Sequence, residues 1–218
     1  MKPSLNEVDA LVRKASRSVG LPWGLADEAA WAASWLSQFD VQGLIIMTNA
    51  LDALANAPLS KVLPQTKQGD GEWTSRGEWL CPICTGASLA DSAILLRAEP
   101  ISTSAVRNPL ILAPFAAAAS RQLDTPVTLE WPDIAIETDG DRMALLGNAD
   151  MIAAGDIFDA KCSIGGVLAD DTLLAKNTRV PIRLATWRRL TDLAAQTHAP
   201  SSAEQGPPNA DSSQAEQD

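Results

Sequence analysis

The chain has 218 residues, of which 46% are hydrophobic and 20% are charged, and this composition is typical of a folded globular protein rather than a disordered or fibrous one. Its formal net charge of −10, together with the lack of clustered lysine and arginine, argues against nucleic acid as a partner and against binding to an anionic membrane surface. No run reaches the roughly 18 apolar residues that a membrane-spanning helix needs.

The cysteine count and the N-terminal residues indicate the compartment. Three cysteines, an odd number, argue against a secreted disulfide framework in a chain of this length. Residues 1–14 contain neither the apolar core nor the small-residue cleavage site of a secretory signal. Together these observations predict a cytoplasmic protein.

A capping-box pattern predicts the first helix. Ser4 and Glu7 are three positions apart, so each side chain can accept a hydrogen bond from the backbone N–H of the other. Apolar residues then recur at helical spacing, which predicts a helix over residues 5 to about 19. Gly20 can end this helix in the left-handed conformation.

Two more helices complete the predicted N-terminal helical unit over residues 1–57. An apolar stripe predicts the second helix over residues 25 to about 39. Asp40 is a candidate N-cap for the third helix over residues 41–57, which is apolar nearly all round in its first half. That pattern is typical of a buried central helix.

Two segments are expected to lack regular structure. Residues 58–78 are polar and have no sustained period, which predicts a loop or a loose hairpin around residues 69–71. Residues 199–218 are rich in Ser, Pro and Gln and poor in apolar residues, which predicts a disordered tail.

Residues 79–198 are expected to form an α+β region. Asp139-Gly140 lies between alternating residues, which predicts an antiparallel hairpin of residues 133–138 with residues 142–146. The fold class predicted for the chain is therefore α+β, in which the N-terminal helical unit packs on a mainly antiparallel sheet with one or two flanking helices. The sequence also predicts a helix over residues 114 to about 123, a strand over residues 156–164 and a last helix over residues 182 to about 196.

The pair Cys81 and Cys84 leaves three interpretations open. With Cys162 and His198 the two could complete a tetrahedral zinc site. A redox pair would need its first cysteine at the start of a helix that follows a strand, and the order of elements lacks the preceding βαβ unit that would favour it. We therefore favour two small buried side chains that fill space where the helices meet the sheet.

Trp23-Gly24 is the other candidate binding feature. Gly24 would let a ligand approach the backbone, and the indole N–H would supply one directed donor. The alternative is that Trp23 only packs on the helix that follows it. His198 as a general base lacks the partners of a known catalytic arrangement, so the catalytic residues stay unknown, and we expect no metal site and no cofactor.

Several stretches resemble a known family. Residues 4–36, and within them WGLADEA, resemble the N-terminal signature of DUF3726, an uncharacterised bacterial family. LCP, GA and LAD within residues 80–91, PLILAPF and the closing LTDLAAQTHAP are also similar to it, so the resemblance extends over most of residues 4–200. It implies a small protein of bacterial metabolism without an established activity. This chain departs from the family where it ends in QGPPNADSSQAEQD instead of a glycine-rich acidic segment.

These observations favour a cytoplasmic small-molecule-binding protein or minor metabolic enzyme. The pocket is expected where the Trp23 loop meets the strand-to-helix turn at residues 81–91, because pockets form where two substructures meet. The residues expected to bind the ligand are Trp23, Gly24, Glu28, Cys81, Cys84, Gly86 and Asp91.

Two alternatives stay open at this point. The chain could be an assembly or interaction subunit, a homo-oligomer or the partner of a metabolic enzyme, with its apolar third helix and alanine-rich surfaces covered by that partner. It could instead be a thiol redox or zinc-binding protein that acts through Cys81 and Cys84.

Overall fold

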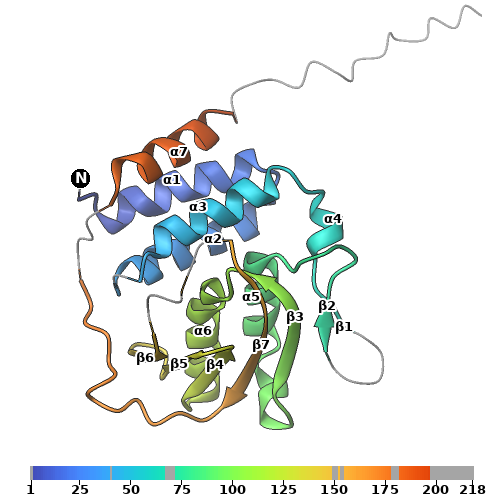
Figure 1. Ribbon diagram of the computed structural model, residues 1–218, viewed down its shortest axis with the longest axis vertical. Helices are drawn as coiled ribbons and strands as arrows, with labels where there is room; N and C mark the ends of the chain where they lie inside the picture. The colour runs from blue at the N-terminus through green and yellow to red at the C-terminus, as the bar shows by residue number, and fades with distance from the viewer. Residues whose placement is uncertain are drawn as a thin grey trace, which may run out of the picture.

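The computed structural model describes residues 2–39, 41–66, 72–148, 152, 155–177 and 182–196, and Figure 1 shows a layer of helices above a sheet that carries two further helices. The predicted α+β class is confirmed. The helices are α1 (Leu5–Ser18), α2 (Trp23–Ser37), α3 (Gly43–Leu54), α4 (Leu59–Val62), α5 (Pro82–Asp91), α6 (Ala113–Leu123) and α7 (Leu184–Ala195), with the 3-10 turns η1 (Ala93–Arg97) and η2 (Pro109–Leu112). The strands are β1 (Gln65–Thr66), β2 (Trp73–Thr74), β3 (Ile101–Arg107), β4 (Val127–Trp131), β5 (Ile134–Thr138), β6 (Met143–Gly147) and β7 (Ile157–Ile164).

The capping box at the start of α1 is confirmed. The backbone N–H of Glu7 donates to the Ser4 hydroxyl at 3.3 Å, and the backbone N–H of Ser4 donates to the Glu7 carboxylate at 2.7 Å. These bonds satisfy backbone donors that the first helical turn leaves free. At the other end Gly20 has φ +93°, as expected of a residue that ends the helix in the left-handed region.

The third helix begins later than its sequence predicts. Gln42, in the left-handed region at φ 56°, is the N-cap of α3, so the prediction that Asp40 caps this helix is wrong, and Asp40 itself lies outside the described residues. Packing sets this start, because a Cβ on Gly43 would lie 2.4 Å from the Cβ of Leu36. Only glycine allows α2 and α3 to approach this closely.

The seven-stranded sheet has the order β1-β2-β3-β7-β4-β5-β6, and every neighbouring pair is antiparallel except β2 with β3. The mainly antiparallel sheet is therefore confirmed, as is the β5–β6 hairpin at Asp139-Gly140. Strand β3 was not predicted, because its sequence ISTSAVR carries hydroxyl side chains and an irregularity between Thr103 and Val106. The segment expected as a loop or loose hairpin contains α4, β1 and β2.

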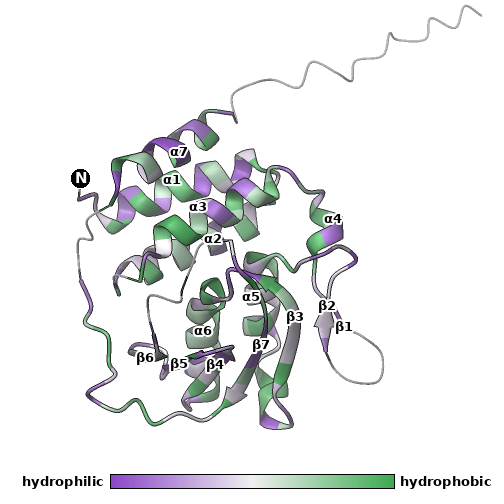
Figure 2. Ribbon diagram, in the orientation of Figure 1, coloured by the Kyte–Doolittle hydropathy of each residue, from purple (hydrophilic) through white to green (hydrophobic). Residues whose placement is uncertain are grey.

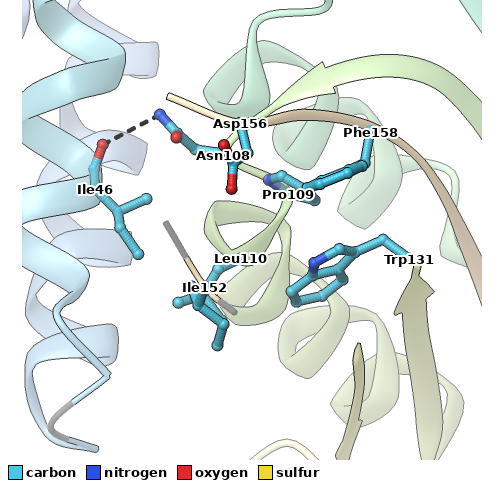
Figure 3. Close-up of a pocket in the computed structure, with 8 residues that line it drawn as sticks. All are labelled: Ile46, Asn108, Pro109, Leu110, Trp131, Ile152, Asp156 and Phe158. Atoms are coloured by element: carbon cyan, nitrogen blue, oxygen red, sulfur yellow. Dashed lines mark hydrogen bonds between the residues drawn. The ribbon is translucent and has the colours of Figure 1, made fainter. Parts of the chain in front are cut away.

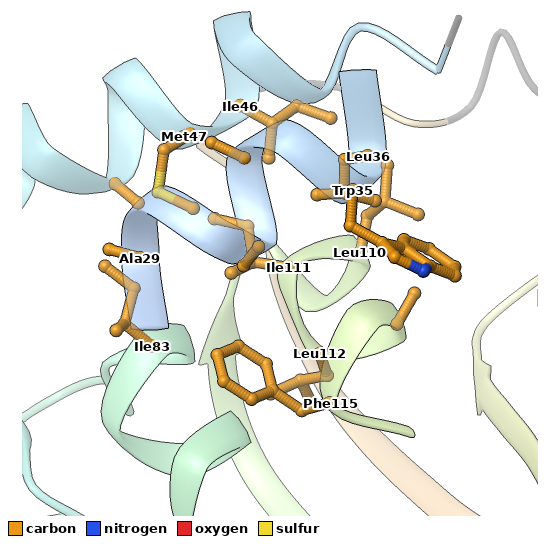
Figure 4. Packing of buried hydrophobic residues seen from close by; sticks show 14 of the residues in the cluster. Ala29, Trp35, Leu36, Ile46, Met47, Ile83, Leu110, Ile111, Leu112 and Phe115 are labelled. Atoms are coloured by element: carbon orange, nitrogen blue, oxygen red, sulfur yellow. The ribbon is translucent and has the colours of Figure 1, made fainter. Parts of the chain in front are cut away.

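The core is continuous from the helical layer to the sheet. Figure 4 shows side chains of α2 and α3 meeting those of η2, α5 and α6, with Phe115 and Ile83 on the sheet side. Figure 2 shows hydrophobic residues along α2, α3, α5 and α6. Helices α5 and α6 contact both the helical layer and the sheet, so both bury more than one face.

The last helix returns to the N-terminal helices. Helix α7 packs along α1 (Figure 1), and its own residues Leu190 and Leu193 are fully buried in this contact. The Arg189 guanidinium also pairs with the Asp52 carboxylate of α3 at 2.7 Å. The predicted domain boundaries stay a prediction, and the expected tail over residues 199–218 lies outside the described residues. Within the described ranges no helix has the length and apolarity that crossing a bilayer requires.

Candidate functional site

Trp23 and Gly24 lie on the surface. Trp23 is the first residue of α2, its side chain is 65% exposed, and the Arg17 guanidinium lies 4.6 Å from the centre of its ring. A Cβ on Gly24 would meet no atom within 4 Å. Neither residue lines the pockets described below.

The cysteines are buried, as predicted. Cys81 is 0% exposed and Cys84 and Cys162 are each 3% exposed, and all three are free thiols. The three do not converge: among the residues that the structure describes, no group of three or more His, Cys, Asp or Glu side chains could hold a metal ion. His198, the fourth ligand of the zinc interpretation, lies outside the described residues.

Among the described residues that precede Cys81 no βαβ unit occurs, as the order of elements in the sequence indicated, but Cys81 does follow an extended residue. Leu80 forms a parallel bridge with Val106 of β3, through the backbone bonds Leu80 N to Ala105 O at 2.8 Å and Arg107 N to Leu80 O at 3.3 Å. Helix α5 therefore follows an extended residue and crosses over to a parallel strand. Cys81 is the N-cap of this crossover helix, in agreement with the strand-to-helix turn that the sequence predicts there.

Gly86 is a point of close helix packing. A Cβ at this position of α5 would lie 2.2 Å from Cδ2 and 2.6 Å from Cγ of Phe115, which is fully buried on α6. The absence of a side chain therefore lets α5 and α6 come together and fixes the ring of Phe115. This ring meets Trp31 of α2 edge to face, with centroids 5.5 Å apart.

Glu28 and Asp91, two of the predicted binding residues, share one hollow between α2, α5 and α6. Its space of about 760 Å³ is continuous with solvent. Trp31 and Phe115 contribute aromatic surface, and carboxylates come from the second turn of α2 and from the last residue of α5. The full lining is Asp27, Glu28, Trp31, Ala90, Asp91, Phe115, Ala118 and Gln122. We call it the acidic hollow.

The negative charge of the acidic hollow is only partly neutralised. Arg13 pairs with Asp27 at 2.6 Å, whereas Glu28 and Asp91 form no ion pair within the described part of the chain. Partial burial, and then the charges of Asp91 and Asp27, raise the pKa of the Glu28 carboxyl group above its usual value of 4.5. Asp91 also sits at the C-terminal end of a helix, where the helix dipole disfavours negative charge.

A second pocket lies where the helical layer meets the sheet (Figure 3), and sequence reasoning missed the residue that organises it. Asn108, 2% exposed and left-handed at φ 52°, donates to the Ile46 carbonyl at 3.4 Å and to the Asn49 side chain at 3.2 Å. Its own backbone N–H donates to the Asp156 carbonyl at 2.7 Å, and its side-chain oxygen accepts from Gly155 N. The only sequence signal for this role of Asn108 is that it directly precedes Pro109, as turn residues often do.

This junction pocket is a structural contact rather than a ligand site. Its free space is about that of one water molecule. Asn108 joins α3, η2 and the start of β7, so its polar atoms are satisfied by the protein itself. The remaining lining is mostly apolar and comprises Ile46, Pro109, Leu110, Trp131, Ile152 and Phe158, with Asp156.

The surfaces behind the interaction-subunit hypothesis are covered within the chain. Helix α3 buries Leu44, Ile46, Met47 and Leu51, among others, and the alanines at 113, 116, 117 and 119 of α6 are fully buried. These faces are therefore occupied without a partner. An oligomer or a protein partner stays a prediction that rests on no surface described here.

The N-terminal third of the chain matches a family model, and the fold has distant structural likenesses. The family described as "Protein of unknown function (DUF3726)" matches residues 3–75. No curated protein matches the sequence. Two solved structures that resemble the fold are malate dehydrogenase from Entamoeba histolytica and sulfolactate dehydrogenase from Methanocaldococcus jannaschii.

The structural likenesses are too weak to carry an argument about function. The malate dehydrogenase has a TM-score of 0.46 and 10% identity, over 73% of this chain and 48% of that one. The sulfolactate dehydrogenase has a TM-score of 0.47 and 14% identity, over 66% of this chain and 47% of that one. The chain thus spans about half the length of either structure. What the comparisons do show is that residues 3–75 match the model of the DUF3726 family, in agreement with the resemblance seen in the sequence.

Proposed function

We propose that the chain is a small-molecule-binding protein whose ligand carries a positive charge and binds in the acidic hollow. One observation carries the proposal: Glu28 and Asp91 lie beside the aromatic surface of Trp31 and Phe115 without a basic partner among the described residues. We also propose the cytoplasm as its compartment, since all three cysteines are free thiols. A minor metabolic role stays a prediction, because no reacting group has been identified.

A cationic ligand fits this hollow for two physical reasons. A positive charge would relieve the repulsion between Glu28 and Asp91 and would complement the negative end of α5. An ammonium group over an aromatic ring gains about 0.5–1 kcal/mol at an exposed site. Because the hollow is open to solvent, we expect weak binding that depends on salt concentration.

The proposal is tested by thermal unfolding of the full chain with choline as the probe. The comparison ligand is the uncharged isostere of choline, in which a quaternary carbon replaces the nitrogen. At a free concentration of ten times its dissociation constant, choline would add about 1.4 kcal/mol to the free energy of unfolding. For a chain of this size that corresponds to a rise in melting temperature of roughly 3–6 °C.

Substitutions assign the effect to the hollow. Glu28→Gln and Asp91→Asn should each reduce the shift that choline produces, whereas Glu99→Gln, an exposed acidic residue outside the hollow, should leave it unchanged. An equal shift with choline and with its isostere would show that charge plays no part. Absence of any shift, or the same shift in all three variants, would reject the acidic hollow as the site.

A further inference from the structure

Cys81 and Cys84 occupy positions from which their side chains meet. Cys81 is the N-cap of α5 and Cys84 is the third helical residue, the same relation that Ser4 and Glu7 have in α1. In α1 the two side chains touch, with the Ser4 hydroxyl 2.8 Å from the Glu7 carboxylate. In α5 the Cys84 side chain stands in the same relation to the Cys81 side chain, and each thiol influences the pKa of the other.

The surrounding backbone holds this pair in place. Pro82 at the first helical position fixes the direction in which α5 starts. On the other side the backbone N–H of Cys81 donates to the Val62 carbonyl at 2.8 Å, and Leu80 is bound to β3. The start of α5 is therefore tied both to the sheet and to α4.

The two thiols differ in acidity. Burial raises the pKa of Cys81, but hydrogen bonds from the Cys84 thiol and from the backbone N–H groups of Cys84 and Ile83 outweigh it, so the net pKa is lowered. The pKa of Cys84 is raised, because its thiol is held protonated in the hydrogen bond to Cys81 and is also buried. The third cysteine, Cys162, has only burial acting on it, and its pKa is raised to about 12.

We propose that Cys81 and Cys84 form a reversible disulfide with each other through exchange with a low-molecular-weight disulfide. This inference is independent of the proposed ligand site. The side chains of an N-cap residue and of the third helical residue face each other, and a disulfide needs Cβ atoms about 3.5–4.5 Å apart, so a small movement of the extended N-cap backbone completes the geometry.

The exchange proceeds in two steps that balance. The Cys81 thiolate attacks one sulfur of the reagent, whose S–S bond breaks and releases one thiolate. The Cys84 thiolate then attacks the Cys81 sulfur and releases the second. The two protein thiols lose two protons and two electrons, and the reagent is reduced to two thiols. Since both side chains are buried in the folded chain, the reagent reaches them during local opening of the start of α5.

Mass spectrometry after thiol trapping tests this inference. The full chain is equilibrated with glutathione at increasing ratios of oxidised to reduced reagent, quenched in acid, alkylated and digested with trypsin. Cleavage after Arg76 and Arg97 leaves both thiols in one peptide, residues 77–97, while Cys162 begins another after Lys161. We expect the first peptide to lose two hydrogen atoms and to escape alkylation, reversibly, while the Cys162 peptide stays alkylated.

Two variants identify the roles of the two cysteines. Cys84→Ser should convert the intramolecular disulfide into a mixed disulfide with glutathione at Cys81, whereas Cys162→Ser should leave the reaction unchanged. A second preparation is oxidised in urea and then refolded, so that slow opening cannot hide the product. The inference is overturned if both thiols of the native chain are alkylated at every glutathione ratio. It is also overturned if the chain that was oxidised in urea and refolded lacks the native fold.

Discussion

Replacing Gly86 by alanine tests the packing that shapes the acidic hollow. The added Cβ would lie 2.2 Å from Cδ2 and 2.6 Å from Cε2 of Phe115, well inside van der Waals contact. The Phe115 ring is fully buried and also contacts Trp31, so it cannot turn away into solvent. Gly86→Ala should therefore separate α5 from α6 or displace the ring.

Two opposing effects set the size of the change. Alanine in place of glycine within a helix stabilises by about 1 kcal/mol. Overpacking of a dense core costs about 1–3 kcal/mol, and so short a contact with a confined ring belongs in the upper part of that range. The expected result is a net loss of about 1–2 kcal/mol in the free energy of unfolding, or roughly 2–8 °C in melting temperature for a chain of this size.

Gly24→Ala is the matched control for this experiment. Gly24 also lies in a helix, but a Cβ there would meet nothing within 4 Å, so only the gain in helix propensity of up to about 1 kcal/mol remains. Urea unfolding of the two variants should give changes of opposite sign. If Gly86→Ala is as stable as the unsubstituted chain, or more stable, the close contact of α5 with α6 is refuted.

Three further predictions concern stability. Leu190→Ala should cost about 2–5 kcal/mol of unfolding free energy, because Leu190 lies fully buried on the inner face of α7. Leu184→Ala, at a half-exposed position of the same helix, should cost far less. Equal effects of the two substitutions would show that α7 does not pack on the helical layer. Burial raises the pKa of the Cys162 thiol from 9.0 to about 12, so its contribution to stability is complete below pH 9.0 and is lost as the pH rises toward 12. The unfolding free energy of the unsubstituted chain should then fall more steeply across that window than that of Cys162→Ala, and parallel curves would contradict the burial of this thiol. The pKa of Glu28 is raised above 4.5 in the folded chain, so the unfolding free energy falls as the pH rises from 4.5 through the pKa of the folded state. Glu28→Gln should therefore stabilise the chain at neutral pH by less than about 0.5 kcal/mol and should lose that advantage in acid. Urea unfolding at several pH values measures this difference.

Local signals in the sequence predicted the elements that local chemistry controls. The Ser4 and Glu7 capping box gave the start of α1, and Asp139-Gly140 gave the β5–β6 hairpin, because each pattern is completed within a few residues. The burial of Cys81 and Cys84 also followed from residue type alone.

Features that depend on distant residues could not be predicted in the same way. The start of α3 at Gly43 is set by contact with Leu36 of the neighbouring helix, and the bridge from Leu80 to Val106 joins segments separated by the whole of α5. Within the candidate site, Glu28 and Asp91 were named individually, but their common hollow exists only because α2, α5 and α6 pack together. Asn108 was missed because its four partners come from two distant segments, α3 and the residues just before β7.

The pKa of the Glu28 carboxyl group, followed by nuclear magnetic resonance with and without choline, tests the proposed ligand site most directly. Binding and ionisation are reciprocally linked, so a cation that prefers the ionised carboxylate must lower its pKa. We predict a pKa above 4.5 in the free chain that falls when choline is added and does not respond to the uncharged isostere. An identical pKa at saturating choline and without it would contradict the assignment of a cationic ligand to the acidic hollow.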